Sequence, residues 1–232
     1  METKKIIDEA LAEGRRALLE YEAEEIFSNY GIPVSPGRLA RNAGEAEAVA
    51  GEIGFPVVMK IMSPQIVHKS DAGGVKVGLT RPEDVAAAWD EIMDNAAAYD
   101  PSARIKGILV QKMISESGGR EVIVGASTDP QFGPVIMFGL GGIFVEVLKD
   151  VSFRVAPVSP EEALRQIREI RTIAILDGVR GNGPIDFTAL ADLISRVSRL
   201  MLEQPRVSEL DANPILASED GVRALDARII LA

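Results

Sequence analysis

The chain has 232 residues, a formal net charge of −10, no cysteine and a single histidine. This composition excludes disulfides, thiolate metal sites and multi-histidine zinc sites. The acidic balance, without any basic block, argues against nucleic-acid binding, and the lack of a signal-peptide core or of a run of about 18 apolar residues predicts a cytoplasmic protein without a membrane span.

Hydrophobic residues make up 47% of the chain, aromatic residues only 5%, and the apolar positions are mainly aliphatic. This favours an α/β (α+β) fold over a β-sandwich. Helical spacing of apolar residues predicts helices, and continuous apolar runs predict strands. In the first half of the chain, helices are expected at 3–30 (broken near Gly14), 43–53 and 82–98, and strands at 36–40, 56–61, 75–79 and 105–114.

In the second half, strands become more frequent. They are expected at 120–126, 134–138, 144–148, 153–157, 207–215 and 222–230, with helices at 160–170 and 186–203. Because only a short turn separates 105–114 from the alternating strand 120–126, these two strands are expected to form an antiparallel hairpin. The simplest organisation is two α+β lobes, formed by residues 1–113 and 114–232.

The only histidine, His68, lies in the loop between the predicted strands 56–61 and 75–79. Neutral imidazole is available near pH 7 and can attack a phosphoryl group, although a lone histidine is more often an ordinary surface residue. Gly73 and Gly74 follow in the same loop. Glycines let backbone N–H groups approach a phosphate closely, but glycine pairs are also common in hairpin turns.

Two further side chains are candidates for nucleotide binding. Lys60 ends an apolar strand, so its ammonium group either reaches solvent or binds an anion such as phosphate. Glu121 lies in the strand 120–126 and either faces solvent or accepts hydrogen bonds from ribose hydroxyls. The glycines at 139–142 match neither a Rossmann fingerprint nor a P-loop.

Asp211, Asn213 and Asp226 form the sharpest constellation of polar residues. Asp211 and Asn213 are two residues apart on one predicted strand and therefore share a face, which Asp226 can reach from the partner strand. Oxygen ligands of this kind suit Mg²⁺, which keeps waters and bridges to nucleotide phosphates. Alternatively, Asn213 initiates a turn with the following proline, and Asp226 faces solvent.

Taken in order, these segments resemble an ATP-grasp domain. More narrowly, they resemble the β subunits of the ADP-forming acetyl-CoA synthetases, within the succinyl-CoA synthetase superfamily. The resemblance extends from about Leu18 to Ile230 and implies two α+β lobes with the nucleotide between them. The segments that carry it are Gly31-Ile32-Pro33, PVVMKI, SPQIVHKSDAGGVKVGL, VQKM, GREVIVG, GLGGIFVEVLKDVSFRVAP, LDANPI and LDARI.

The resemblance implies nucleotide-binding roles by matching position. Lys60 matches the lysine that contacts the ATP phosphates. Gln111, Lys112 and Met113 match the hinge segment that holds the adenine largely through backbone groups, and Glu121 matches the acid that binds the ribose.

The resemblance also implies the residues of phosphoryl transfer. Asn213 and Asp226 match the Mg²⁺ ligands, and Asp211 takes the place of a glutamate that steadies a phosphohistidine. His68 matches the histidine that is transiently phosphorylated on a mobile loop. Glu146 and Arg154 also lie in matching stretches, but the resemblance assigns them no clear role.

The family reaction is acyl-CoA + ADP + phosphate ⇌ acid + CoA + ATP, so the implied cofactors are Mg²⁺ and ATP or ADP. The implied partner is a CoA-binding α subunit with its own phosphohistidine, in an α2β2 heterotetramer. Two alternatives remain open. A stand-alone ATP-grasp carboxylate ligase would need no phosphohistidine, and a non-catalytic nucleotide-sensing module would be expected to lack Lys60, His68 or the Asp/Asn set, all of which are present.

Overall fold

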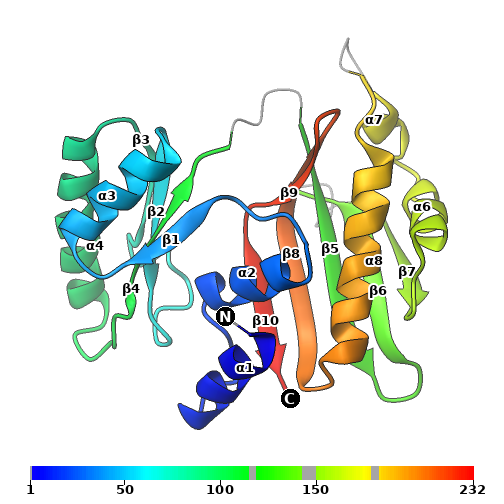
Figure 1. The fold of residues 1–232 in the computed structure, drawn as a ribbon, viewed down its shortest axis with the longest axis horizontal. Helices are drawn as coiled ribbons and strands as arrows, with labels where there is room; N and C mark the ends of the chain where they lie inside the picture. The colour runs from blue at the N-terminus through cyan, green and yellow to red at the C-terminus, as the bar shows by residue number, and fades with distance from the viewer. Residues whose placement is uncertain (1, 115–118, 143–149, 179–182) are drawn as a thin grey trace. The chain divides into compact units, whose positions relative to one another are not determined.

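The computed structural model describes residues 2–114, 119–142, 150–178 and 183–232. Figure 1 shows the fold as a ribbon. The chain divides into a large unit, Met1–Val34 with Glu116–Ala232, and a small unit, Ser35–Ser115. The strand expected at 144–148, which contains Glu146, lies outside the described residues.

The division differs from the expected one in the placement of the first 34 residues, which belong to the large unit. Helix α2 (Glu20–Asn29) buries Ile26 and Phe27 in the core of that unit. The segment before it pairs with the sheet, since the amide of Leu18 donates to the carbonyl of Ile229 at 3.0 Å. Helical periodicity identifies the apolar face of a helix but not the sheet that covers it.

The small unit is an antiparallel sheet in the strand order β1-β4-β2-β3, with two helices packed on one face. Its elements are β1 (Gly37–Ala40), α3 (Ala43–Ile53), β2 (Val57–Met62), β3 (Val75–Leu79), α4 (Pro82–Tyr99) and β4 (Gly107–Lys112). Val57, Met59 and Ile61 are fully buried in the core shared with the helices. The intervening residues of β2 therefore point to the other face.

The large unit contains a second antiparallel sheet, in the order β10-β8-β5-β6-β7, with β9 paired to β8. The further elements are α1 (Thr3–Ala12), β5 (Arg120–Asp129), β6 (Gly133–Leu140), β7 (Val151–Val155), α6 (Pro160–Arg168), α7 (Ala174–Asp177), α8 (Phe187–Glu203), β8 (Val207–Ser218), β9 (Gly221–Ala224) and β10 (Ala227–Leu231). Helix α8 packs on β5, β6 and β9, and α6 packs against α8 (Figure 1).

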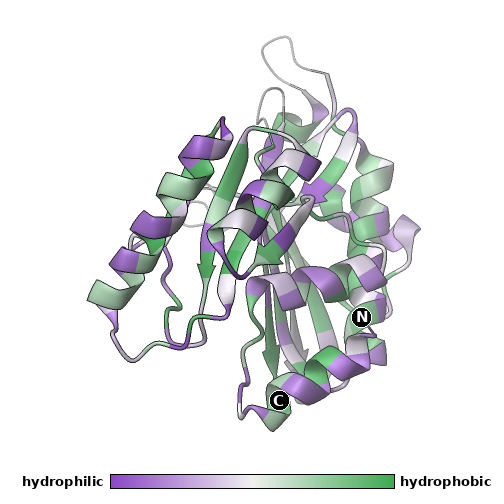
Figure 2. Ribbon diagram, turned by 60° about the vertical axis from the view of Figure 1, so that its left-hand side comes forward, coloured by the Kyte–Doolittle hydropathy of each residue, from purple (hydrophilic) through white to green (hydrophobic). Residues whose placement is uncertain are grey.

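Side chains alternate between the two faces of the large sheet. Val124, Phe138, Ala212 and Ile229, on four different strands, join one core cluster with apolar side chains of α8. The hydrophobic colouring in Figure 2 is concentrated in the strands, whereas the helices alternate between hydrophilic and hydrophobic residues. The other positions form what we call the pocket face: Glu121, Ile123, Gly125, Ser127, Val135, Met137, Gly139, Val151, Phe153, Val155, Glu209, Asp211, Asn213, Arg228 and Ile230.

The predicted hairpin between 105–114 and 120–126 is wrong. Strand β4 pairs with β1 and β2 in the small unit, whereas β5 pairs with β6 and β8 in the large unit. Sequence neighbours usually pair, but here the chain passes from one unit to the other between the two strands. The α+β class itself is confirmed, since both sheets are antiparallel and carry helices.

In the part of the chain that the structure describes, no helix is both long and apolar enough to cross a lipid bilayer.

Candidate functional site

A row of paired residues crosses the pocket face of the large sheet. Asp211 lies opposite Arg228 on β10 and Gly125 on β5, Gly125 lies opposite Met137 on β6, and Met137 lies opposite Phe153 on β7. Together with the next row they line a pocket of about 300 Å³. Asp211 therefore sits at the wall of a cavity that combines an apolar floor with polar groups.

Asp211 and Asn213 point to the same face, as their spacing predicted, and their side chains are hydrogen-bonded to each other. Asp211 is half-buried, and burial raises the pKa of its carboxyl group. The positive charge of Arg228 and the hydrogen bond from Asn213 act in the opposite direction. The carboxyl group therefore lies in an environment less polar than water, beside a cation.

Asp226 does not lie within a strand as expected, because Leu225 and Asp226 form a break between β9 and β10. The amide of Leu225 donates to the carbonyl of Pro214 at 2.9 Å, and Ala227 pairs with Ala212. Asp226 is thus held beside Asn213, between these two backbone anchor points. The break interrupts the regular strand pairing at the position of the predicted metal ligand.

The chemistry of the donor set is compatible with Mg²⁺. Asn213 and Asp226 offer hard oxygen donors at neighbouring positions, and within the described ranges no group of three or more His, Cys, Asp or Glu residues could hold a metal by itself. Mg²⁺ commonly takes one or two carboxylates and completes its shell with water and substrate phosphates. The two residues therefore suit a metal that arrives with a nucleotide.

Glu121 also belongs to the pocket face, on β5, and two glycines lie against it. The amide of Gly141 donates to the carbonyl of Glu121 at 2.7 Å. A Cβ atom at Gly141 would lie 2.8 Å from the Cβ of Glu121, and one at Gly142 would lie 3.2 Å from its Oε2. Glycine at both positions therefore leaves room around this carboxylate.

Lys60 does not end its strand, because β2 continues to Met62. It is half-buried and points away from the helices, opposite Leu109 on β4 and Val75 on β3. Gln111 is 2% exposed and shares this face, since it pairs with Val58. A partly buried lysine within a sheet costs free energy unless its ammonium group is paired, so Lys60 remains a candidate for binding an anion.

The predicted hinge residues have most of their hydrogen-bond donors occupied. The amides of Lys112 and Met113 donate to the carbonyls of Pro36 (2.7 Å) and Pro56 (3.0 Å). The ammonium group of Lys112 donates to the carbonyl of Phe55 at 2.6 Å. The side chain of Lys112 thus connects the end of β4 to the turn before β2.

His68 is exposed at the tip of the loop that joins β2 and β3. The loop is fixed on both sides of it, because Ile66 and Ala72 are buried in the core of the small unit (1% and 5% exposed). Asn95 of α4 also donates to the carbonyl of Gly73 at 3.1 Å. The structure therefore presents the imidazole on a short exposed segment between two anchored ends.

Gly73 and Gly74 have packing reasons of their own. Gly73 has a φ of +62°, and a Cβ at Gly74 would lie 2.4 Å from the Cγ2 of Ile61. Their amides donate within the loop, to the carbonyls of Ser70 (3.0 Å) and Lys69 (2.8 Å). These two amides are therefore already bonded and do not form the backbone phosphate cradle that the sequence analysis considered.

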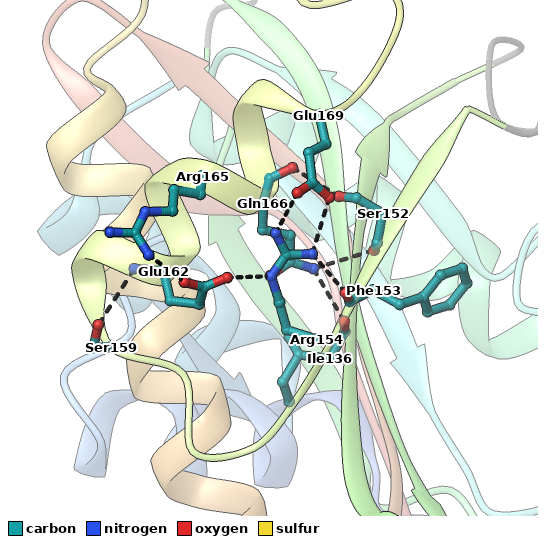
Figure 3. A network of polar contacts seen from close by, with 9 residues as sticks. All are labelled: Ile136, Ser152, Phe153, Arg154, Ser159, Glu162, Arg165, Gln166 and Glu169. Atoms are coloured by element: carbon teal, nitrogen blue, oxygen red, sulfur yellow. Dashed lines mark hydrogen bonds and ion pairs between the residues drawn. The ribbon is translucent and has the colours of Figure 1, made fainter.

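Arg154, which the sequence left without a role, connects β7 to α6 (Figure 3). Its guanidinium group donates to Glu162 at 2.6 Å and to Glu169 at 2.5 and 2.9 Å. The neighbouring Phe153 points to the opposite side of the strand (Figure 3). Arg154 therefore lies on the helix side of the sheet, away from the pocket face.

We predict that Arg154→Met lowers the melting temperature near pH 7 by a few degrees without changing nucleotide affinity. Arg154 lowers the pKa of both Glu162 and Glu169. The stabilisation is therefore present above the ordinary glutamate pKa and is lost as the pH falls below about 4. Melting temperatures of the variant and of wild type, measured near pH 7 and below about pH 4, check this: the difference should be present at the first pH and absent at the second. Arg165→Met, which removes a 73% exposed cation that pairs with Glu162, should cost less.

Asp211 is the one residue lining this pocket that the sequence analysis named, and the residues that it missed include Gly125 and Arg228. Arg228 follows Asp226 by two residues, so counting with the strand period would have placed both on one face. Gly125 interrupts the alternating strand REVIVGA, and a glycine inside a strand often marks a close approach of another group. Neither signal identifies the pocket without the strand register.

The fold and the site define the class of protein. A family model described as an ATP-grasp domain matches residues 9–231, and the chain belongs to this family, more narrowly to the β subunits of ADP-forming acetate–CoA ligases. Acetate–CoA ligase [ADP-forming] I subunit beta of Pyrococcus furiosus is 55% identical over 98% of this chain and 97% of that protein.

Two further comparisons extend this result. Acetate–CoA ligase [ADP-forming] I of Archaeoglobus fulgidus is 48% identical over 98% of this chain, which corresponds to 33% of that protein. A solved structure of acetyl-coenzyme A synthetase 1 of Candidatus Korarchaeum cryptofilum matches with a TM-score of 0.88 and 44% identity over the whole of both chains. That structure holds coenzyme A and Mg-AMPPCP, with its phosphohistidine segment pointing towards the nucleotide binding site.

Proposed function

We propose that this chain is the nucleotide-binding subunit of an ADP-forming acyl-CoA synthetase and transfers a phosphoryl group between His68 and ADP. The overall reaction is acyl-CoA + ADP + phosphate ⇌ acid + CoA + ATP. The observation that carries the proposal is the grouping of Asp211, Asn213 and Asp226 at one end of the pocket face, in a chain whose relatives are acetate–CoA ligases.

In the direction of ATP consumption, an imidazole nitrogen of His68 attacks the γ-phosphorus. The nitrogen–phosphorus bond forms as the bond to the β,γ-bridging oxygen breaks, the electron pair leaves with ADP, and the other ring nitrogen keeps its proton. Exposure of His68 suits a group that must reach both the nucleotide and a second phosphoryl donor. Asp211 then stabilises the phosphorylated imidazole by accepting a hydrogen bond from its remaining N–H.

Binding of the nucleotide falls to the other predicted residues. Lys60 neutralises phosphate charge, Glu121 accepts hydrogen bonds from the ribose, and the carbonyl oxygens of 111–113 contact the adenine. Asn213 and Asp226 would hold Mg²⁺, which supplies further charge neutralisation at the phosphates when bound.

The partner is proposed to be a CoA-binding α subunit, in an α2β2 complex that works in the cytoplasm, where ATP and coenzyme A are both available. This chain accounts for a third of the single-chain relative from Archaeoglobus fulgidus. The remaining two thirds of such a protein are the natural source of the CoA site. The acyl group is then chosen by the partner.

The test is reconstitution of the chain with its CoA-binding subunit. We expect ATP formation from acetyl-CoA, ADP and phosphate only when both subunits are present, and a mass of two copies of each by light scattering. Formation of acyl-CoA by this chain alone would favour the stand-alone ligase. Nucleotide binding without any turnover in the reconstituted complex would favour the sensing module.

A further inference from the structure

We propose that Arg228 binds the oxygens of the phosphoryl group in transit, in the pocket floored by Gly125. This rests on the proposed function and deepens it by naming a phosphate-binding residue that the family resemblance did not supply. Four observations carry it: the position of Arg228, the lack of a close ion pair, the spacing from the metal ligands, and the glycine beneath it.

The first observation is position. Ala227, Ile229 and Leu231 of β10 are buried in the core of the large unit, so Arg228 points to the pocket face. It lies directly opposite Asp211 and lines the same cavity. The guanidinium group is therefore held beside the carboxylate proposed to meet the phosphorylated imidazole.

The second observation is that Arg228 is exposed and, among the described residues, has no carboxylate within ion-pair distance. Two other arginines of this unit form ion pairs within the protein: Arg154 with Glu162 and Glu169, and Arg206 with Asp8. Arg228 acts on Asp211 only through its charge. Its planar set of donors is thus available for a ligand, and this geometry matches phosphate oxygens.

The third observation is spacing. Arg228 lies two residues along the chain from Asp226, and Asp211 lies two residues from Asn213. Two residues of a strand span about 7 Å, a distance that an arginine side chain can bridge. The guanidinium group can therefore reach the terminal phosphoryl group of a nucleotide bound beside the proposed metal ligands. It can also reach the phosphoryl group after its transfer from the nucleotide.

The fourth observation is the floor of the pocket. A Cβ atom at Gly125 would lie 3.2 Å from Cε of Met137 and 3.9 Å from Oδ1 of Asp211, so a larger side chain would enter the pocket. Gly125 has no left-handed φ and its strand does not require glycine. Glycine inside a strand costs stability, so its presence here is best explained by the space that it leaves beside Asp211.

The experiment compares Arg228→Met and Arg228→Lys with wild type in single-turnover phosphorylation of His68 by Mg-ATP. We expect about 100-fold slower transfer for Arg228→Met, as for the loss of one charge-stabilising donor, and partial recovery for Arg228→Lys, which restores charge but not the planar fork. Arg165→Met, on the helix-covered side, is the matched control and should transfer at the wild-type rate.

Affinities for ATP and ADP, measured by calorimetry, distinguish the two sources of the phosphoryl group. Weaker ATP binding with unchanged ADP binding assigns the contact to the γ-phosphate of the bound nucleotide. Unchanged affinity for both, with slow transfer, assigns it to the group once it is on histidine. An Arg228→Met protein that transfers within twofold of wild type overturns the proposal.

Gly125→Val provides a second test that leaves Arg228 in place and decides the question if Arg228→Met does not fold. Valine favours strand structure, so we expect an undiminished melting temperature together with transfer slowed at least about tenfold, because the side chain fills the space beside Asp211. Wild-type transfer in a folded Gly125→Val protein overturns the proposal. If wild type itself takes up no phosphate on His68, it is the proposed function that fails.

Discussion

Replacing His68 with asparagine will abolish phosphorylation of this chain by Mg-ATP and lower acyl-CoA synthetase turnover of the reconstituted complex by about 10⁴-fold or more, as expected when a covalent nucleophile is removed. The physical reason is that asparagine retains a similar size and polarity but offers no nucleophilic nitrogen. Because His68 is exposed, the substitution should leave the melting temperature and the affinity for Mg-ATP unchanged.

The chemical stability of the phosphate identifies its position. Phosphate on His68 should be lost in acid and retained in base, whereas phosphate on serine behaves in the opposite way. Ser70, two residues further along the same exposed loop, is therefore the matched control, and Ser70→Ala should be phosphorylated like wild type. Turnover retained by His68→Asn in the complex would exclude the relay and favour direct ligation by an ATP-grasp site.

The local structure of this chain is largely readable from its sequence. Helix α3 and strand β3 have the predicted bounds, and Ser159 caps α6 as its type and position suggest, by accepting from the amide of Glu162. These features depend on caps, apolar spacing and glycine stops within a few residues. Local physical chemistry decides them, so one sequence suffices.

Pairing between distant segments is not readable in the same way. The strand 120–126 alternates as an antiparallel strand should, but alternation does not name the partner, and β5 pairs with β8 far along the chain. The first two helices are amphipathic, yet nothing local assigns them to the large unit. Both errors arise because burial is satisfied by any complementary apolar face.

The candidate site shows the same division between local and distant information. Asp211 and Asn213 were found from their spacing on one strand, and the structure joins their side chains. Arg228 and Gly125 become neighbours of Asp211 only through the pairing of β8 with β10 and β5. Gly73 and Gly74 show the converse, since a motif that suggests phosphate binding is explained by packing on Ile61 and by a left-handed backbone.

Asp226→Asn is expected to raise the Mg²⁺ concentration needed for phosphorylation of His68 by at least about 100-fold, more than is usual for residues that only support a metal ligand. The substitution removes one negative charge and one oxygen donor from the side chain and leaves its size unchanged. Mg²⁺ titration of the single-turnover rate at fixed ATP measures it. Asp220→Asn, at the exposed turn between β8 and β9, is the control and should not shift the Mg²⁺ requirement.

The double variant Asn213→Ala/Asp226→Asn shows whether the two residues act on one ion. Ligands of a single ion are coupled, so the double variant should lose clearly less than the sum of the two single losses. Independent sites would give additive losses. Additive losses would therefore show that Asn213 is not a ligand of the metal, even if each single variant is impaired. Its role would then be to orient Asp211 through their hydrogen bond.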